Sequence, residues 1–270
     1  MEKVGDYIVD STPHGMIDGQ HWTYRSREEV LAKLSNDEHY YGDYGSKFLS
    51  NSNISQLINN PTQFSEPRED SVNLMFGRAF HELIMFGKTQ NDNYIEASTR
   101  NTNKYKEASA EAGGLIFLKK EWDDLNLLVD TSLKNETVKQ FLNNKKSKYE
   151  VPNFGTMEHT DSGVLWKCKA DIVTEDCLID IKTSSSLGGF KYSSKAYNYD
   201  SQAFIYSTMF QKPMKFLVIE KGTGCVGFYE VSDDAYDRGR EKVSKAEENY
   251  LKYFVEKSHR LENFTVYGEI

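Results

Sequence analysis

Two short apolar segments, residues 167–173 and 178–183, constrain the fold of this chain more than any other feature. They mark two strands of apolar and β-branched residues, predicted over residues 170–173 and 177–181, and the polar residues Thr174, Glu175 and Asp176 lie between these strands. Runs of this kind on either side of a short polar stretch are typical of two strands joined by a turn. The sequence therefore predicts a β-hairpin in this region.

The predicted hairpin carries charged side chains among apolar neighbours. Since side chains alternate between the faces of a strand, Asp180 and Lys182 share one face, while Ile181 points into the opposite apolar layer. Asp171 lies near the end of the partner strand. A charge inside an apolar strand costs free energy unless it is paired or bound to a metal. The hairpin is therefore either a surface hairpin with an ion pair, the commoner reason for Asp-x-Lys in a strand, or a site where carboxylates bind a hard cation such as Mg²⁺.

An apolar stretch upstream, residues 72–87, has the length and composition of a buried helix. His81 and Glu82 are its only adjacent polar pair. Gly77 comes one helical turn before His81, so we expect it on the same face, where it would leave space beside the imidazole. This pattern makes His81 a candidate functional residue.

A second helix is predicted downstream, over residues 199–206. Gln202 and Tyr206 are four residues apart, so they share one face of this helix. Both carry neutral hydrogen-bonding groups that suit a phosphate or a sugar. They are candidate substrate contacts.

In this order, the pattern G-x-x-x-H, then D, then D-I-K-T, then Q-x-x-x-Y resembles the PD-(D/E)XK nuclease superfamily. Within it, the chain looks most like the phage and prophage exonucleases of the exodeoxyribonuclease VIII (RecE-like) type, relatives of bacteriophage lambda exonuclease. The resemblance runs from about Ser52 to about Phe210. It covers well over half of the chain, and the order and spacing of four short motifs carry it.

The resemblance implies a role for each matching residue. Lys182 would orient or deprotonate the attacking water, and Glu150, in a predicted strand over residues 148–154, could help to bind a second ion. The implied metal ligands are His81, Asp171, Asp180 and the backbone carbonyl of Ile181. The implied DNA contacts are Lys169, Gln202, Tyr206 and, from the His81 helix, Arg78. Lys169 stands where many relatives have arginine; lysine keeps the charge but loses bidentate phosphate binding.

The resemblance also implies the fold and the activity. The expected fold is α/β, a central mixed β-sheet flanked by helices with a restriction-endonuclease-like core. The expected activity is Mg²⁺-dependent removal of nucleotides from 5′ ends of double-stranded DNA, with Mn²⁺ as a substitute. The 3′ single strands left behind would serve a single-strand annealing recombination protein, and relatives suggest a homo-oligomeric ring.

Two alternatives stay open. The chain could be a structure-specific endonuclease of the same superfamily, or a non-catalytic DNA- or protein-binding module that retains the fold. The three residues Asp171, Asp180 and Lys182 count against the second alternative, because a decayed site has no physical reason to keep them all.

The net charge of −8 and the pI near 5.4 count against simple DNA binding, because duplex affinity comes mainly from phosphate neutralisation by Lys and Arg. Local lysine clusters soften this argument. The polar stretch 143–148 is the candidate DNA-contacting loop. The other clusters are Lys119 with Lys120, Lys167 with Lys169, and Lys191 with Lys195.

The remaining composition sets limits. The 270 residues of the chain suffice for one sizeable core. We expect the chain to divide into an N-terminal arm with a first helix, residues 1–50, and a nuclease domain, residues 51–270. The sequence has no P-loop, so no ATP requirement is expected. Its three cysteines fall in predicted strands, which indicates small buried side chains and argues against an iron–sulfur cluster. Without a signal-peptide core or an apolar run of about 20 residues, we expect a cytoplasmic protein with no membrane contact.

Several further elements are predicted. Ser26 and Glu29 have capping-box spacing, which marks the start of a helix. Two strands are expected over residues 215–220 and 225–231, followed by a long helix from the cap at Ser232 to about Lys257.

Overall fold

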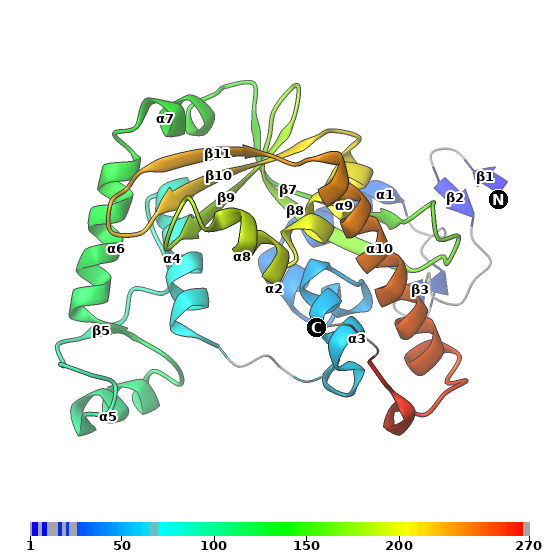
Figure 1. The fold of residues 1–270 in the computed structure, drawn as a ribbon, viewed down its shortest axis with the longest axis horizontal. Helices are drawn as coiled ribbons and strands as arrows, with labels where there is room; N and C mark the ends of the chain where they lie inside the picture. Colours follow the sequence, from blue (N-terminus) through cyan, green and yellow to red (C-terminus); the bar gives the residue numbers. More distant parts are fainter. Residues whose placement is uncertain are drawn as a thin grey trace.

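The protein folds around a mixed β-sheet with helices on both faces (Figure 1). The computed structural model describes residues 26–64, 66 and 70–266, together with the backbone of four short strands nearer the N-terminus. These strands pair in two small sheets, β1 with β2 and β3 with β4. Their bounds are Glu2–Val4, Tyr7–Val9, Met16–Ile17 and Gln20–His21. The other residues of 1–25 lie outside the described part, so the predicted arm stays a prediction.

The central sheet has the strand order β11-β10-β9-β8-β7. Its strands are β7 (Lys148–Thr156), β8 (Leu165–Val173), β9 (Leu178–Ser184), β10 (Met214–Glu220) and β11 (Val226–Glu230). Neighbouring strands are antiparallel except β9 and β10, which are parallel. A parallel pair needs a crossover connection, which here contains α8 (Phe190–Ala196) and α9 (Tyr199–Phe210). The predicted hairpin and the mixed sheet are thus confirmed.

The two faces of β9 and β10 enter different cores. Ile179 and Ile181 pack with α4 (Val72–Phe86) and α6 (Lys119–Ser132). Leu178 packs in the cluster that includes residues of α8 and α9. This is the alternation that the sequence pattern predicts, and it places Asp180 and Lys182 on the face of α8 and α9.

Helix α10 (Asp233–Tyr250) packs against α9 and α3 (Ile54–Asn59), as Figure 1 shows. Its buried Glu247 accepts hydrogen bonds from the Trp166 indole, at 2.5 Å, and from the Ser162 hydroxyl, at 2.8 Å. Because Trp166 belongs to β8, these bonds tie the helix to the strand that carries Asp171.

The N-terminal helices cover the other face of β7 and β8. Helix α1 (Arg27–Leu34) begins with the capping box predicted at Ser26, and α2 (Asp37–Tyr41) follows it. Residues of both helices share a buried cluster with Phe154 of β7 and Leu165 of β8. These helices therefore lie beside the strands that position Glu150 and Asp171.

A segment between α4 and β7 in the sequence lies at the margin of the sheet (Figure 1). Besides α6 it contains β5 (Tyr94–Ile95), α5 (Asn103–Glu111), β6 (Phe117–Leu118) and α7 (Glu136–Leu142). Short 3₁₀ helices cover Gly45–Lys47, Asn51–Asn53, Pro61–Gln63 and Leu261–Asn263.

Two sequence expectations are corrected. Helix α10 ends at Tyr250 and continues as a π-helix, Leu251–Val255, rather than reaching Lys257 as an α-helix. Cys168 and Cys177 are buried as expected, but Cys225 is exposed, because it lies in the turn before β11 and not within a strand. Among the helices of the described residues, none combines the length and the hydropathy needed to cross a bilayer.

We expect Gly239→Ala to destabilise the protein although alanine favours helices. A Cβ built on Gly239 of α10 would overlap the carbonyl oxygen of Asp200 and lie 2.9 Å from the Cβ of Phe204, both on α9. Overpacking of this kind typically costs about 1–3 kcal/mol. Gly77→Ala on α4 is the matched control, because its Cβ would meet no atom within 4 Å and helix propensity favours it by up to about 1 kcal/mol. Denaturant unfolding measures both; equal stabilities would contradict the close contact between the two helices.

Candidate metal centre

The hairpin opens at Asp171. Strands β8 and β9 pair at Val173 with Leu178 and at Ile172 with Ile179. At the next position the Asp171 carboxylate, through Oδ2, accepts the backbone N–H of Ile181 at 2.8 Å. A side chain thus takes the place of a ladder partner, and the two strands separate with Asp171 at the opening.

Strand β8 also rotates at this point. Ala170 packs in the cluster with α9, whereas Ile172, two residues further on, packs in the cluster with α4 and α6. In a regular strand, residues two apart face the same side. The break in this alternation turns the Asp171 side chain toward α4.

Glu150 of β7 lies opposite Asp171 in the register and has a strained backbone. The ladder pairs Tyr149 with Ile172 and Val151 with Ala170, and Glu150 between them has φ +50°. A residue other than glycine rarely adopts this conformation, which tends to occur at functional sites. Two facing irregularities therefore bring two carboxylates together.

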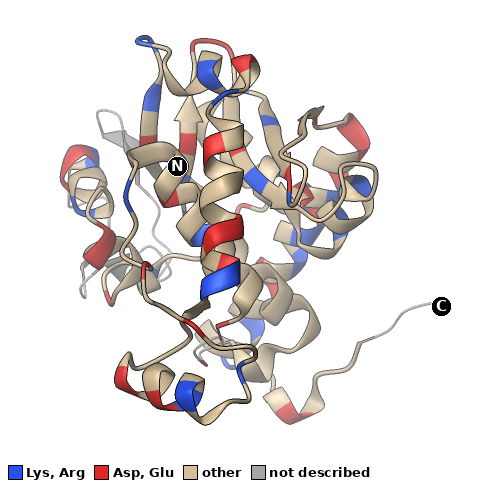
Figure 2. Ribbon diagram, turned by 90° about the vertical axis from the view of Figure 1, so that its left-hand side faces the viewer, with Lys and Arg blue, Asp and Glu red and all other residues tan. Residues whose placement is uncertain are grey.

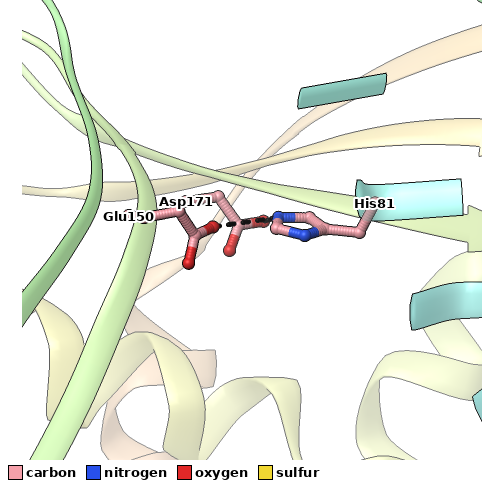
Figure 3. A group of neighbouring side chains, drawn as sticks. All are labelled: His81, Glu150 and Asp171. Atoms are coloured by element: carbon pink, nitrogen blue, oxygen red, sulfur yellow. Dashed lines mark ion pairs between the residues drawn. The ribbon is translucent and has the colours of Figure 1, made fainter. Parts of the chain in front are cut away.

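His81 reaches the two carboxylates from α4 (Figure 3). Its Nε2 atom lies 3.3 Å from Oε1 of Glu150 and 3.4 Å from Oδ2 of Asp171. The helix is held in place by its apolar face, by the side-chain cap of Ser71 and by a left-handed Gly87 at its end. One ligand atom from each of these three residues lies within 4.8 Å of the others, a spacing that suits a metal ion.

The electrostatics of this cluster reflect crowded carboxylates. Burial alone would lower the pKa of His81, but Asp171 and Glu150 outweigh it and raise the pKa to about 9. Burial, together with the Asp171 carboxylate, raises the pKa of Glu150 to about 7. Burial would also raise the pKa of Asp171, yet His81, Lys182 and the Ile181 N–H hold it below its ordinary value.

Asp180 forms a second group beside the first. Its Oδ2 lies 2.5 Å from the Lys182 ammonium, and its Oδ1 accepts the Gln202 amide at 2.5 Å. Burial raises the pKa of Asp180 to about 6, although Lys182 opposes the shift. Burial would lower the pKa of Lys182, but Asp180, Tyr199 and Asp171 raise it above its ordinary range. Lys182 is therefore protonated at neutral pH.

The residues fit a divalent cation. Several buried side-chain atoms of the described residues have no well-oriented hydrogen bond, and three of them lie in this centre: Nε2 of His81, Oε1 of Glu150 and Oδ2 of Asp180. These atoms are satisfied only by ion pairs, of His81 with Glu150 and of Asp180 with Lys182, so they keep the capacity to bind a cation. Two carboxylates and an imidazole are a donor set that Mn²⁺ accepts and that Mg²⁺ tolerates when water fills its remaining positions.

The family follows from a comparison with known families. The model of a PDDEXK-like domain of unknown function (DUF3799) matches residues 49–259. The chain belongs to this family. A search of curated proteins finds no match to it.

One solved structure supports the fold of this PDDEXK-like domain. A provisionally named exonuclease from Eubacterium rectale has a TM-score of 0.59 at 14% identity, over 87% of this chain and 95% of the other. A phage-related exonuclease from Haemophilus somnus 129PT gives a TM-score of 0.32 at 14% identity, over 67% of this chain and 96% of the other. The first likeness bears out the restriction-endonuclease-like fold expected from the sequence.

The four residues expected to contact DNA differ in how far solvent reaches them. Gln202 is buried and bound to Asp180, and the half-buried Tyr206 packs into the clusters beneath α9. Lys169 is 7% exposed at its side chain and pairs with Asp37 of α2. Arg78 is exposed on α4, where it pairs with Asp70 at 2.5 Å. The direct DNA contacts of all four stay predictions.

One group of residues near the centre was not predicted from the sequence. Tyr40 and Tyr41 of α2 stack around the Lys169 ammonium, which lies 4.5 Å and 5.5 Å from their ring centroids. Helix α2 has only five residues, so no periodicity identifies it. A pair of adjacent tyrosines after an acidic stretch was the only available signal.

We expect the domain to bind Mn²⁺ more tightly as the pH rises. In the metal-free state His81, with a pKa of about 9, and Glu150, with a pKa of about 7, hold protons that a cation must displace. Raising the pH from about 6.5 to about 8.5 weakens this competition, on the order of tenfold in affinity per pH unit for each displaced proton as long as the pH lies below the pKa of the group that holds it. Calorimetry in buffers of different ionisation enthalpy measures both the affinity and the released protons. Glu150→Gln should release fewer protons; a pH-independent affinity would contradict the shared site.

Proposed function

We propose that this PDDEXK-like domain is a divalent-metal-dependent deoxyribonuclease, and specifically an exonuclease that degrades double-stranded DNA from its 5′ ends with Mg²⁺ or Mn²⁺. The observation that carries the proposal is the position of His81, Glu150 and Asp171 next to the Asp180–Lys182 pair. Carboxylates, an imidazole and a protonated lysine in one buried place are the groups that phosphodiester hydrolysis needs. Family membership and the fold of the Eubacterium rectale exonuclease support it.

Each residue has a distinct part in this reaction. A bound divalent cation supplies Lewis-acid stabilisation of the phosphoryl oxygens and favours deprotonation of the attacking water. His81, Glu150 and Asp171 would hold the cation, with Asp180 beside them. Lys182 keeps its proton, so it acts as a hydrogen-bond donor and a positive charge rather than as the base that activates water.

The supporting groups fix these residues in place. Gln202 donates to Asp180, and the Ile181 N–H donates to Asp171, so each carboxylate keeps one orientation. A catalytic group held by such bonds needs little rearrangement when charge develops on the phosphate. We infer that Gln202 is a positioning residue, a role different from the DNA contact implied by the resemblance.

The acidic composition limits how DNA is held. In Figure 2, basic and acidic residues are interspersed along the helices that face the viewer. In the candidate loop 143–148, Lys146 already pairs with Glu175, at 3.2 Å. We propose that the cation and Lys182 supply the main attraction for the phosphate that is cut. An annealing recombination protein and a ring of identical chains are further proposals, and the three free cysteines fit a reducing cytoplasm.

We expect Asp171→Asn, Asp180→Asn and Lys182→Met each to lower the rate of DNA degradation by about 100-fold or more, since each removes charge from the centre. Release of acid-soluble nucleotides from linear duplex with added Mg²⁺ measures the rate. Asp176→Asn, in the exposed turn of the same hairpin, is the matched control and should keep the wild-type rate. Circular dichroism checks the fold, and an unchanged rate in any of the three folded variants refutes the assignment.

An exonuclease should degrade linear plasmid and spare the covalently closed form, because only the linear form offers ends. With duplex labelled at one 5′ end, we expect the label to be released at the start of digestion while the complementary strand survives. Chelation by EDTA should stop the reaction, and Mn²⁺ should restore it. Cutting of the closed circle would identify an endonuclease, and early loss of a 3′ label would reverse the polarity.

A further inference from the structure

A large aromatic side chain is exposed on a rigid turn near the centre. Tyr197, between α8 and α9, is 65% exposed. The next residue, Asn198, has φ +57°, and three groups hold it: its carbonyl accepts Asn51 Nδ2 at 3.1 Å and the Ser201 hydroxyl at 3.0 Å, and its side chain accepts Lys242 at 2.8 Å. The turn is thus fixed from several sides, and it holds an aromatic ring in solvent.

Two contacts connect this ring to the proposed catalytic lysine. The ring of Tyr197 lies 5.9 Å from that of Tyr199, centroid to centroid. The ammonium of Lys182 lies 5.0 Å from the centroid of Tyr199. Tyr197 is therefore two side chains away from the group that would contact the phosphate.

A second exposed tyrosine lies on the side of the centre that carries Glu150 and Asp171. Tyr41 of α2 is 77% exposed and packs edge-on against Tyr40, with centroids 5.0 Å apart. The Lys169 ammonium lies 5.5 Å from its centroid, and Lys169 precedes Asp171 by two residues on β8. Through these contacts Tyr197 is connected to Lys182 on β9, and Tyr41 is connected to Lys169 on the neighbouring strand β8.

We propose that Tyr197 and Tyr41 stack on bases of the substrate strand that flank the phosphate to be cut. This inference rests on the proposed function and deepens it. Bases inside a duplex already stack on both sides, so a ring can stack only on a base that is unpaired or terminal. The two tyrosines therefore select a strand end whose last bases have separated from the partner strand.

The charge of the protein favours this mode of binding. An acidic chain gains little from phosphate neutralisation, whereas base–aromatic stacking does not depend on net charge. Because the turn that carries Tyr197 is already ordered by the bonds to Asn198, little backbone entropy is lost when the base arrives. Stacking at this place holds the strand end beside Lys182 without a large basic surface.

The test combines protein variants with changes in the DNA. The substrates are linear duplexes whose terminal nucleotides on the degraded strand are either intact or abasic. Loss of one stacked base typically costs a factor of about 5–100 in affinity. We expect the wild-type protein to show a KM higher by that factor on abasic ends, with kcat changed less.

Tyr197→Ala and Tyr41→Ala should raise KM on intact ends by a similar factor. For these variants, KM should rise little further on abasic ends, because the stacking interaction is already absent. Tyr197→Phe keeps the ring and should retain the wild-type KM. Tyr94→Ala is the matched control: Tyr94 is 47% exposed on β5, away from the sheet in Figure 1. It should behave as wild type.

The outcomes separate two failures. The stacking inference is overturned, and the nuclease assignment stands, if the wild-type protein degrades DNA but both alanine variants keep its KM. The same holds if the KM of both variants rises on abasic ends by as large a factor as that of the wild type. If the wild-type protein degrades no DNA with Mg²⁺ or Mn²⁺, the proposed function falls and this inference falls with it.

Discussion

The hydrogen bond between the Asp171 carboxylate and the Ile181 N–H is the interaction on which the rest of the centre depends. A gap between two buried strands would normally leave backbone donors without partners, at a considerable cost in free energy. Here the carboxylate satisfies the donor, so β8 and β9 can separate inside a packed sheet. The same oxygen faces His81. One bond thus satisfies the backbone donor and orients a candidate metal ligand.

The centre also brings several carboxylates close together, and the nearby positive side chains only partly offset the repulsion between them. Glu150 and Asp180 both have raised pKa values, of about 7 and about 6, mainly because they are buried. Glu150 additionally holds a strained backbone conformation. Such features destabilise a fold, so they persist where a function requires them. A cation bound to the folded state alone would offset this cost by mass action, which links metal binding to stability.

Local pattern in the sequence was enough to predict the hairpin, the α4 helix and the place of His81, because alternation and a polar pair in an apolar helix are both local signals. The approach of His81 to Asp171 joins segments far apart in sequence, and only the resemblance implied it. The left-handed conformation of Glu150 has no compositional signal. The substrate contact of Gln202 stays a prediction, and its bond to Asp180 was not predicted, because helical spacing identifies a face and not a partner.

The charges at the centre also bear on the order of binding. When His81 is neutral, as a metal ligand must be, the three carboxylates of Glu150, Asp171 and Asp180 outnumber the single ammonium of Lys182. Before a cation binds, His81 holds a proton, so the imidazolium and the Lys182 ammonium offset these carboxylates and a phosphodiester meets no strong net attraction there. A divalent cation would displace that proton, neutralise the carboxylates and supply a Lewis acid for the phosphoryl oxygens. In the proposed reaction the phosphate therefore gains its main attraction only once the cation is bound, while the stacking tyrosines hold the DNA end.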